Sequence, residues 1–376
     1  MINNPIPSRL IGADLINTGK LLPRAQLAFA SCVPPIDFLA GETHFMDHLY
    51  PIWAALPDRL RGTFYAVQVG PSGHRYPQLR DHVVEQGYEY VSVQGSKTQV
   101  TKELFVRQGR PVVVASVVDM RLCQRVRRPV VFCEHGSGQT YGGRIGSYAG
   151  GSGRDGVVLF LCPNESVQQK NQHYYPRVPS VVVGCPKLDA WAQPLPAGPS
   201  LDKIAISFHW PCGVSPESGT AWDHFKGALL GLVEHFGADQ LLGHAHPRML
   251  STVRPAYERL GIQVAKHFGE VVARASLYVC DNSSTIFEFA RLGRPVVVLN
   301  SPKYRRDVSH GLRFWEYADV GVQCDEPGDL IEAIVYALTD PPEVAARRLE
   351  ISELVYPYWG QSTQLAVEAL TELVAA

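Results

Sequence analysis

Short runs of continuously apolar, β-branched residues recur along this 376-residue chain and constrain its fold more than any other feature. A strand that is apolar at every position, not at every second one, is typical of a parallel sheet covered on both faces. In the first half the runs are Thr63–Val69, Tyr88–Val93, Pro111–Val117, Val130–Cys133, Val157–Cys162 and Val181–Val183. Helix-like stretches separate several of them, for example Tyr76–Gln86 and Thr101–Gln108, so the pattern predicts repeated βαβ units.

A second alternating series follows the proline-rich stretch Ala190–Ser200, which we interpret as an interdomain linker. Its expected strands are Leu201–Phe208, Gln240–Gly243, Gly261–Ala265, Leu277–Cys280 and Pro295–Asn300. Its expected helices are Trp222–Phe236, Val253–Leu260, Ser284–Leu292, Asp329–Leu338, Pro342–Leu354 and Gln361–Ala376. A single core usually stops growing near ~250–300 residues, so we predict an α/β protein with two Rossmann-like domains in tandem that face a cleft. We expect an acceptor-side domain at residues 1–190, a donor-side domain at 200–345, and helices of 346–376 that pack back across the junction.

The formal net charge of −1 argues against nucleic acid as the main partner, because a nucleic-acid-binding face is usually strongly basic. No apolar run is long enough to predict a transmembrane helix, and the first residues lack the pattern of a secretory signal. The eight cysteines include no CxxC pair, and most end or follow strand-like runs. We therefore expect buried thiols in a reducing cytoplasm, with neither a disulfide framework nor a zinc site.

The segment Asp281–Ser284 lies between the strand-like run Leu277–Cys280 and a helix-like stretch. Serine and aspartate are good helix N-caps, so the simplest interpretation is a capped turn. The unpaired N–H groups of a helix start and the two serine hydroxyls are also suited to bind a diphosphate without metal. Asp281, itself an anion, is expected to orient those groups and not to touch phosphate. Glu288 is either a solvated helix residue or a cleft residue that accepts hydrogen bonds from ribose hydroxyls.

The order of motifs in this half resembles the CDP-glycerol glycerophosphotransferase family, the teichoic acid and capsule polymerases and primases, which have a GT-B fold. The residues that carry it are Asp281-x-Ser283-Ser284 with Glu288, followed by Arg294-Pro295 before another strand. Three further segments are similar to motifs of this family: Gly184–Asp189 at the domain junction, His244–Pro247, and Lys303–Arg305 with Gly311. The resemblance covers most of residues 184–330. Each motif alone is weak, but their shared order and spacing are fairly specific.

Two histidines stand out because each comes just after a strand-like run. His135 follows Val130–Cys133 and precedes a glycine, and a neutral imidazole there can take a proton from an acceptor hydroxyl. The resemblance supports this role, because a His-Gly pair at a strand end carries it in the family. His246 is expected to donate to a phosphoryl oxygen and to stabilise the charge of the leaving group. No third ligand accompanies His244 and His246, so we predict no metal site.

The chain departs from the family pattern at two places. The stretch after His135 is rich in glycine and lacks the family's Pro and Lys, so it is either a loop that closes over substrate or a plain surface loop. After the run ending at Phe208, His209-Trp210 stands where the family has a Trp-Arg pair, so a phosphate contact is lost or passes to His209. The acceptor and the transferred group are therefore open, and a UDP-sugar fits the same fold.

The leading hypothesis is a metal-independent, inverting transferase, without cofactor, that moves a glycosyl or glycerophosphoryl group from CDP-glycerol or an NDP-sugar to an acceptor hydroxyl. The acceptor would be a carbohydrate or polyol phosphate of surface polysaccharide synthesis, which would allow peripheral membrane association. The alternatives are a UDP-sugar 2-epimerase-like enzyme, a glycosyltransferase acting on nucleic acid, and a non-catalytic subunit. The candidate catalytic residues are His135 and His246; the donor-binding ones are His209, His244, Arg248, Asp281, Asn282, Ser283, Ser284, Glu288 and Arg305; those of the acceptor loop are Gly136, Ser137, Gln139 and Tyr141.

Overall fold

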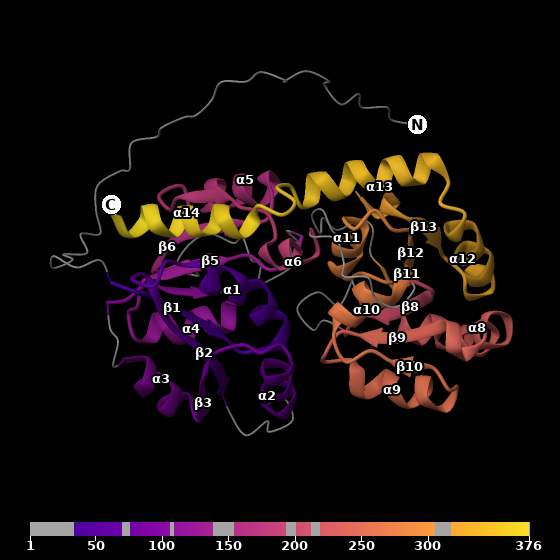
Figure 1. The fold of residues 1–376 in the computed structure, drawn as a ribbon, viewed down its shortest axis with the longest axis horizontal. Coiled ribbons are helices and arrows are strands. Elements are labelled where there is room, and N and C mark those ends of the chain that lie inside the picture. The colour runs from indigo at the N-terminus through magenta and orange to yellow at the C-terminus, as the bar shows by residue number, and fades with distance from the viewer. Residues whose placement is uncertain are drawn as a thin grey trace, which may run out of the picture.

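The computed structural model describes residues 34–69, 76–105, 109–137, 154–192, 201–211, 219–304 and 317–375. Two parallel sheets stand next to each other, each with helices on both faces (Figure 1). The predicted fold class, an α/β protein with two Rossmann-like domains in tandem, is confirmed. Three of the candidate site residues, Gln139, Tyr141 and Arg305, lie outside the described residues, as does Gly311 of the family resemblance.

The first sheet has seven strands in the order β3-β2-β1-β4-β5-β6-β7. These strands are β1 (Ile36–Ala40), β2 (Arg61–Val69), β3 (Val91–Gly95), β4 (Val112–Val114), β5 (Val130–Cys133), β6 (Val157–Cys162) and β7 (Ser180–Val182). The helices between them are α1 (Thr43–Ala55), α2 (Tyr76–Glu85), α3 (Lys97–Phe105), α4 (Val117–Arg125) and α5 (Glu165–Tyr174). Because the strand order reverses between β1 and β4, the carboxyl ends of these strands form a switch point, where such sheets bind ligands.

The second sheet has six strands in the order β10-β9-β8-β11-β12-β13. These strands are β8 (Lys203–Phe208), β9 (Leu241–Ala245), β10 (Gln263–Val264), β11 (Ala275–Cys280), β12 (Val296–Leu299) and β13 (Val322–Cys324). The helices around it are α7 (Trp222–Phe225), α8 (Leu229–Phe236), α9 (Leu250–Arg259), α10 (Phe268–Arg274), α11 (Thr285–Ala290) and α12 (Leu330–Leu338). Its strand order reverses between β8 and β11, so a second switch point lies at the carboxyl ends of those two strands.

The domains are joined by the 3-10 turn η2 (Pro186–Leu188) with α6 (Asp189–Ala192), and by the C-terminal helices α13 (Pro342–Val355) and α14 (Ser362–Ala375). Figure 1 shows α13 lying along the second domain and α14 along the first. Ala366 and Leu370 of α14 join the core beneath α1 of the first domain. Asp189 holds the start of α14 by accepting hydrogen bonds from its backbone N–H groups, including that of Thr363 at 2.6 Å.

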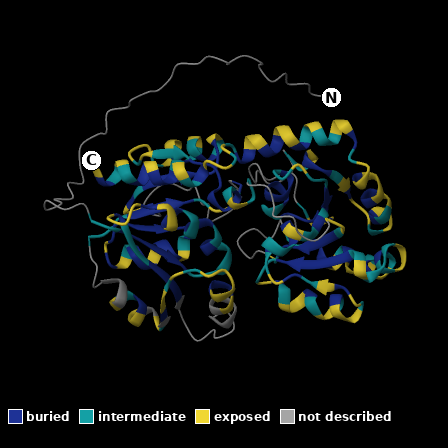
Figure 2. Cartoon of the chain, in the orientation of Figure 1, coloured by how far each residue is buried: buried dark blue, intermediate teal, exposed yellow. Residues whose placement is uncertain are grey.

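Each sheet is buried on both faces, as the continuous apolar runs predict. Separate clusters of apolar side chains pack on the two faces of the first sheet and on the two faces of the second. Figure 2 shows the strands buried, while the exposed residues lie mostly on the outer sides of the helices. All six cysteines within the described residues are buried free thiols: Cys123, Cys133, Cys162, Cys185, Cys280 and Cys324.

Two parts of the first domain differ from the sequence-based expectation. The expected strand Pro111–Val117 ends at Val114, because the Ser116 side chain accepts a hydrogen bond from Asp119 N–H and caps α4. Strand β1 and helix α1 were not predicted. Asp37 interrupts the apolar run of β1, where it is fully buried and paired with Arg128 at 2.6 Å.

Candidate functional site at the junction of the two domains

The candidate site lies where the carboxyl ends of strands from both sheets come together. The first domain contributes the loop after β1 and the loop after β5, and the second contributes the loops after β8, β9 and β11. Gly136, in the loop after β5, is close enough to Ser284 that a Cβ at position 136 would lie 3.4 Å from the serine Oγ. The His-Gly pair of one domain and the serine pair of the other, far apart in sequence, are therefore neighbours in the fold.

Asp281 is the buried anchor of the second domain's loops. Its carboxylate is fully buried and accepts hydrogen bonds from the backbone N–H of His209 at 2.7 Å and of Ala221 at 2.9 Å. The hydroxyl of Thr220 donates to the same carboxylate at 3.1 Å. An anion whose oxygens are engaged in this way holds the backbone N–H groups of the segment after β8 in place.

The serine pair follows Asp281 at the start of α11. Ser283 Oγ lies 2.8 Å from Thr285 Oγ1, and the Thr285 hydroxyl in turn lies 2.9 Å from the phenol oxygen of Tyr278. Ser284 is the N-cap residue of α11, but its side chain makes no capping hydrogen bond. Its hydroxyl is thus placed beside Gly136 of the other domain without being used to cap the helix. Asn282 is buried and its amide nitrogen donates to the Gly219 carbonyl at 2.9 Å.

His135 is exposed, and its ring orientation is fixed by the backbone of the neighbouring strand end. The Nδ1 atom lies 2.5 Å from the carbonyl oxygen of Ala115, which only accepts, so Nδ1 carries a proton. In the neutral ring Nε2 is then the basic nitrogen, as a general base requires. The ring packs edge-on against Phe45 of α1, with the two centroids 4.7 Å apart.

His246 has the opposite protonation pattern. Its Nδ1 accepts a hydrogen bond from the backbone N–H of Arg248 at 3.1 Å, so the proton of the neutral ring is on Nε2. The guanidinium of Arg248 lies over the Trp210 ring, 4.6 Å from its centroid, and pairs with Glu42 of the first domain. The ring of His209 lies 5.1 Å from that of His246. The loops after β8 and β9 thus form one surface that carries two imidazoles and a guanidinium.

His44, which the sequence analysis did not select, lies between the two candidate catalytic histidines. Its ring centroid is 5.7 Å from that of His135 and 5.3 Å from that of His246. It lies in the first turn of α1, four residues after the end of the buried strand β1. Had β1 been recognised, the rule that selected His135 and Asp281, a polar residue just after a buried strand, would have found His44 too.

Lys187 and Glu288 form a buried ion pair at the back of the site, with Nζ and Oε2 2.6 Å apart. Glu288 is 1% exposed, so it is not a solvated helix residue. Lys187 Nζ also lies over the Phe268 ring, 4.8 Å from its centroid. Burial alone would lower the Lys187 pKa, but Glu288 and then Asp47 of α1 outweigh it and raise that pKa. The lysine of the junction motif therefore links the connecting segment to α11.

His244 and His48 are the buried members of the histidine group. His244 is buried, its Nδ1 lies 2.9 Å from Ser207 Oγ, and burial lowers its pKa to about 3. His48 is buried with its Nδ1 3.6 Å from the sulfur of Cys185, and burial, followed by the charge of Lys187, holds its pKa well below the usual range. Both rings are therefore neutral at physiological pH and line the interior side of the site.

The base of the glycine-rich segment is held on both sides. Before it, the carbonyl of Ser137 accepts a hydrogen bond from the Asn164 side chain at 3.1 Å. After it, the guanidinium of Arg154 lies over the Phe132 ring, 4.2 Å from its centroid, and pairs with Glu134 at 3.2 Å. The residues that flank His135 are thus fixed by both ends of this segment.

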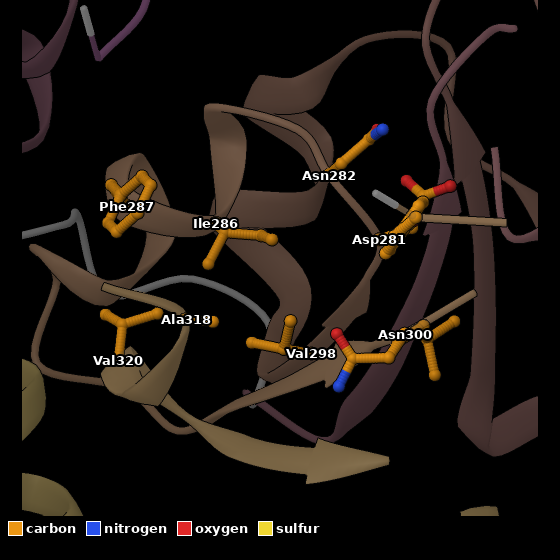
Figure 3. A pocket seen from close by; sticks show the side chains of 10 residues that line it. Asp281, Asn282, Ile286, Phe287, Val298, Asn300, Ala318 and Val320 are labelled. Carbon is orange, nitrogen blue, oxygen red and sulfur yellow. The ribbon is translucent and has the colours of Figure 1, made fainter. Parts of the chain in front are cut away.

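A small pocket lies in the second domain next to Asp281 and Asn282 (Figure 3). Its walls are apolar side chains of α11, β12 and the turn before β13, namely Ile286, Phe287, Val298, Leu299, Ala318 and Val320. Asn300 gives it a polar wall. The Asn300 amide nitrogen donates to Asp325 at 2.7 Å and to Gln323 at 3.2 Å, which fixes the amide so that its oxygen is available as an acceptor.

Neither a metal centre nor a membrane-spanning helix is found in the described part of the chain. No group of three or more His, Cys, Asp or Glu side chains there has the geometry to hold a metal ion. No helix in the same ranges is long and apolar enough to cross a membrane.

No protein-family model and no curated protein sequence matches the chain, but solved structures do. The wall teichoic acid polymerase TagF matches with a TM-score of 0.62 and 13% identity, covering 91% of this chain and 89% of its own. The UDP-GlcNAc 2-epimerase from Neisseria meningitidis, bound to UDP-GlcNAc, matches with a TM-score of 0.55 and 14% identity, over 90% of this chain and 100% of its own. The S. aureus MnaA–UDP structure has a TM-score of 0.55 and 13% identity, covering 91% and 98%. The fold is therefore of the GT-B type, shared with transferases and epimerases alike.

Proposed function

We propose that the protein is a metal-independent, inverting transferase that moves a glycosyl or glycerophosphoryl group from a nucleotide-activated donor to an acceptor hydroxyl. The observation that carries this proposal is that two histidines from opposite domains use their Nδ1 atoms in opposite ways, one towards a backbone carbonyl and the other towards a backbone N–H. His135 donates through Nδ1 to Ala115 and keeps Nε2 as a base, whereas His246 accepts at Nδ1 and keeps its proton on Nε2. A base and a hydrogen-bond donor on opposite sides of one site are what such a transfer needs.

In this mechanism Nε2 of His135 takes the proton of the acceptor hydroxyl. The hydroxyl oxygen forms a bond to phosphorus, or to the anomeric carbon of a sugar, on the side opposite the leaving group. The bond to the nucleotide breaks at the same time, and the leaving phosphate keeps the electron pair. The Nε2–H of His246 donates to the phosphoryl oxygen on which charge develops. No side chain needs to form a covalent intermediate.

The donor's phosphates are assigned to the serine pair and to the loops after β8 and β9. The hydroxyls of Ser283 and Ser284 supply hydrogen bonds, and Arg248 supplies positive charge. Glu288 remains the proposed ribose ligand; a ribose hydroxyl would share the carboxylate that now accepts from Lys187. The fully enclosed position of Asp281 supports its role as an anchor that does not touch the donor.

A nucleotide-sugar 2-epimerase is the second candidate, because solved structures with this name share the fold. Such an enzyme needs carboxylates that act on the carbon atoms of the sugar ring. Here three carboxylates at the junction are already paired with cations: Glu42 with Arg248, Glu134 with Arg154 and Glu288 with Lys187. The most central residues of the site are imidazoles, which favours transfer to a hydroxyl over epimerisation.

The test is a thermal-shift screen against CDP-glycerol and UDP-, GDP- and dTDP-sugars, followed by product analysis with and without polyol-phosphate and oligosaccharide acceptors. A donor present at 100 times its Kd should stabilise the protein by about 2.7 kcal/mol. A transferase consumes the donor only when an acceptor is present, and His135→Ala should lower turnover by ~100-fold or more. Release of free nucleotide and a 2-epimeric sugar without acceptor would favour the epimerase. A His135→Ala variant with unchanged turnover would refute the mechanism.

A further inference from the structure

Asn164, the residue just before α5, forms hydrogen bonds with backbone groups of three different parts of the chain. Its side-chain oxygen accepts from the backbone N–H of Val167 at 3.0 Å, which caps α5. Its amide nitrogen donates to the carbonyl of Ser137 at 3.1 Å and to the carbonyl of Val355 at 3.0 Å. Asn164 is 1% exposed, so water does not compete for these three bonds.

Capping alone does not account for an asparagine at this position. The N-cap of a helix needs one side-chain oxygen, which serine, threonine and aspartate also provide. Of these good N-cap residues, asparagine alone adds an NH₂ group, which can donate twice. Because the oxygen of Asn164 accepts from Val167, the orientation of the amide is set and its nitrogen faces the two carbonyls. The side chain therefore forms a bridge in addition to the cap.

One end of this bridge is the loop that carries His135. Before that residue, the backbone N–H of Glu134 donates to the carbonyl of Leu161 at 3.0 Å, a contact within the first domain. After it, the carbonyl of Ser137 accepts from Asn164. The two hydrogen bonds fix the backbone on both sides of His135, and the second of them connects this backbone to the bridge.

The other end of the bridge belongs to the second domain. Val355 is the last residue of α13, and it is buried in the same core cluster as Ile286 and Phe287 of α11. The next carbonyl along the chain, that of Tyr356, accepts from Nε of Arg291 at 3.1 Å, and Arg291 is the C-cap residue of α11. Hydrogen bonds and packed side chains thus connect the helix that follows the serine pair to the loop of the proposed base.

We infer that Asn164 is a positioning residue that holds the loop of His135 in a fixed place relative to the donor-binding helix α11. This inference rests on the proposed function, in which His135 takes the proton of the acceptor hydroxyl. Asn164 is buried and acts through Ser137, not on a reactant. Because a misplacement of about 1 Å can lower a rate by ~100-fold, loss of the bridge should slow transfer. The proposed phosphate ligands belong to the second domain, so donor affinity should stay the same.

The test compares Asn164→Ser with Asn171→Ser. Serine at position 164 keeps an oxygen that can cap α5, but its single O–H cannot bridge two carbonyls. Asn171 is the matched control, because it is a fully buried asparagine of the same helix whose amide nitrogen contacts Cys162 of its own domain. The ¹³Cε1 resonance of His135, assigned with His135→Gln, reports the position of the loop without requiring activity. Calorimetry gives the affinities for UDP and CDP, and thermal unfolding checks that each variant folds.

We expect Asn164→Ser to shift the His135 resonance and to lower the transfer rate by ~10-fold or more, while UDP and CDP bind as tightly as they do to the wild type. Asn171→Ser should leave both the resonance and the transfer rate unchanged, although both variants should unfold at a lower temperature than the wild type. A rate that falls without a change in donor affinity is the signature of a displaced base. A merely structural role would not produce it in one variant alone.

The outcomes separate this inference from the proposed function. If the His135 resonance is unmoved in Asn164→Ser, or moves equally in Asn171→Ser, Asn164 does not position the loop and only the inference fails. If the resonance moves in Asn164→Ser alone, but the wild type binds no nucleotide and consumes no donor, the inference stands and the proposed function fails. Should Asn164→Ser not fold, the exchange of the Asn164 side-chain amide protons with water is measured in the wild type. Slow exchange then supports the bridge, and fast exchange overturns it.

Discussion

Lys187, in the segment that connects the two domains, and Glu288, on α11, form a buried ion pair with 2.6 Å between Nζ and Oε2. Removing one partner of such a pair strands a charge in the interior and typically costs about 3–5 kcal/mol, whereas removing both costs less. The pair therefore couples the domain connection to the helix that begins with the serine pair.

A double-mutant cycle measures this coupling. We expect Lys187→Met and Glu288→Gln each to lower the free energy of unfolding by about 3 kcal/mol, and the double variant to lose less than the sum of the two. Urea denaturation at pH 7 provides the three values. The exposed pair Lys226–Asp223 is the matched control, because a surface pair contributes only about 0–1 kcal/mol. Strictly additive losses for Lys187 and Glu288 would contradict the coupling.

Gly136 should not tolerate a side chain. Its φ is +84°, and an added Cβ would lie 3.4 Å from Ser284 Oγ. Gly136→Ala should cost about 1–2 kcal/mol through backbone strain and would place a methyl group against the Ser284 hydroxyl. Gly156→Ala is the matched control, since φ is +82° there and the nearest atom is the Arg128 carbonyl oxygen at 3.9 Å. Both variants should unfold at similarly lowered temperatures, but only Gly136→Ala should lose nucleotide affinity. If Gly136→Ala and Gly156→Ala bound nucleotide with equal affinity, the space between Gly136 and Ser284 would not be part of the nucleotide site.

Asp119 should make stability fall as pH rises. Burial raises the pKa of its carboxyl from 3.8 to about 7, so the folded protein holds this proton more tightly than the unfolded chain does. The stabilisation is complete below pH 3.8 and is lost as pH rises towards 7. Asp119→Asn should remove this dependence. Between pH 5 and pH 8 the free energy of unfolding of the wild type should therefore fall by about 2 kcal/mol more than that of the variant. Chemical denaturation at those two pH values tests this. Parallel curves for variant and wild type would refute it.

His244 should act in the opposite direction. Burial lowers its pKa from 6.5 to about 3, so the unfolded chain binds the proton more readily than the folded protein. Its contribution is complete above pH 6.5 and is lost as pH falls towards 3. His244→Asn, which can still hydrogen-bond to Ser207, should flatten the acid side of the stability curve by about 2 kcal/mol between pH 6.5 and pH 4.5. The exposed histidine variant His173→Ala should leave that slope unchanged. A slope equally steep in His244→Asn would show that His244 is not the group responsible.

Apolar continuity was sufficient to predict the two parallel sheets, because strands such as Val130–Cys133 and Val296–Leu299 are buried on both faces. Polar residues just after such strands led to His135, His246 and Asp281. The same rule failed at β1, because Asp37 breaks the apolar run and its burial depends on Arg128, 91 residues away. Because β1 was not predicted, His44, which follows it, was not selected as a candidate.

Long-range pairing also explains what the sequence leaves open at Glu288. From its position in the helix, Glu288 could be either a solvated residue or a ribose ligand. Its actual partner, Lys187, is 101 residues away in the sequence, so this ion pair cannot be deduced from the local sequence pattern. The proximity of Gly136 to Ser284 is likewise a product of how the two domains dock. Motif order predicted the candidate residues of the site, whereas the contacts between them required the tertiary structure.

The position of α14 has a consequence for how this chain is made. Ala366, Leu370 and Val374 belong to the same core as Ile36 and Phe38 of β1. During synthesis the first domain emerges from the ribosome long before these residues, so part of its apolar surface stays uncovered while the entire second domain is translated. The N-terminal domain is thus the first to be synthesised and, by this packing, cannot finish folding until the C-terminal helix has emerged.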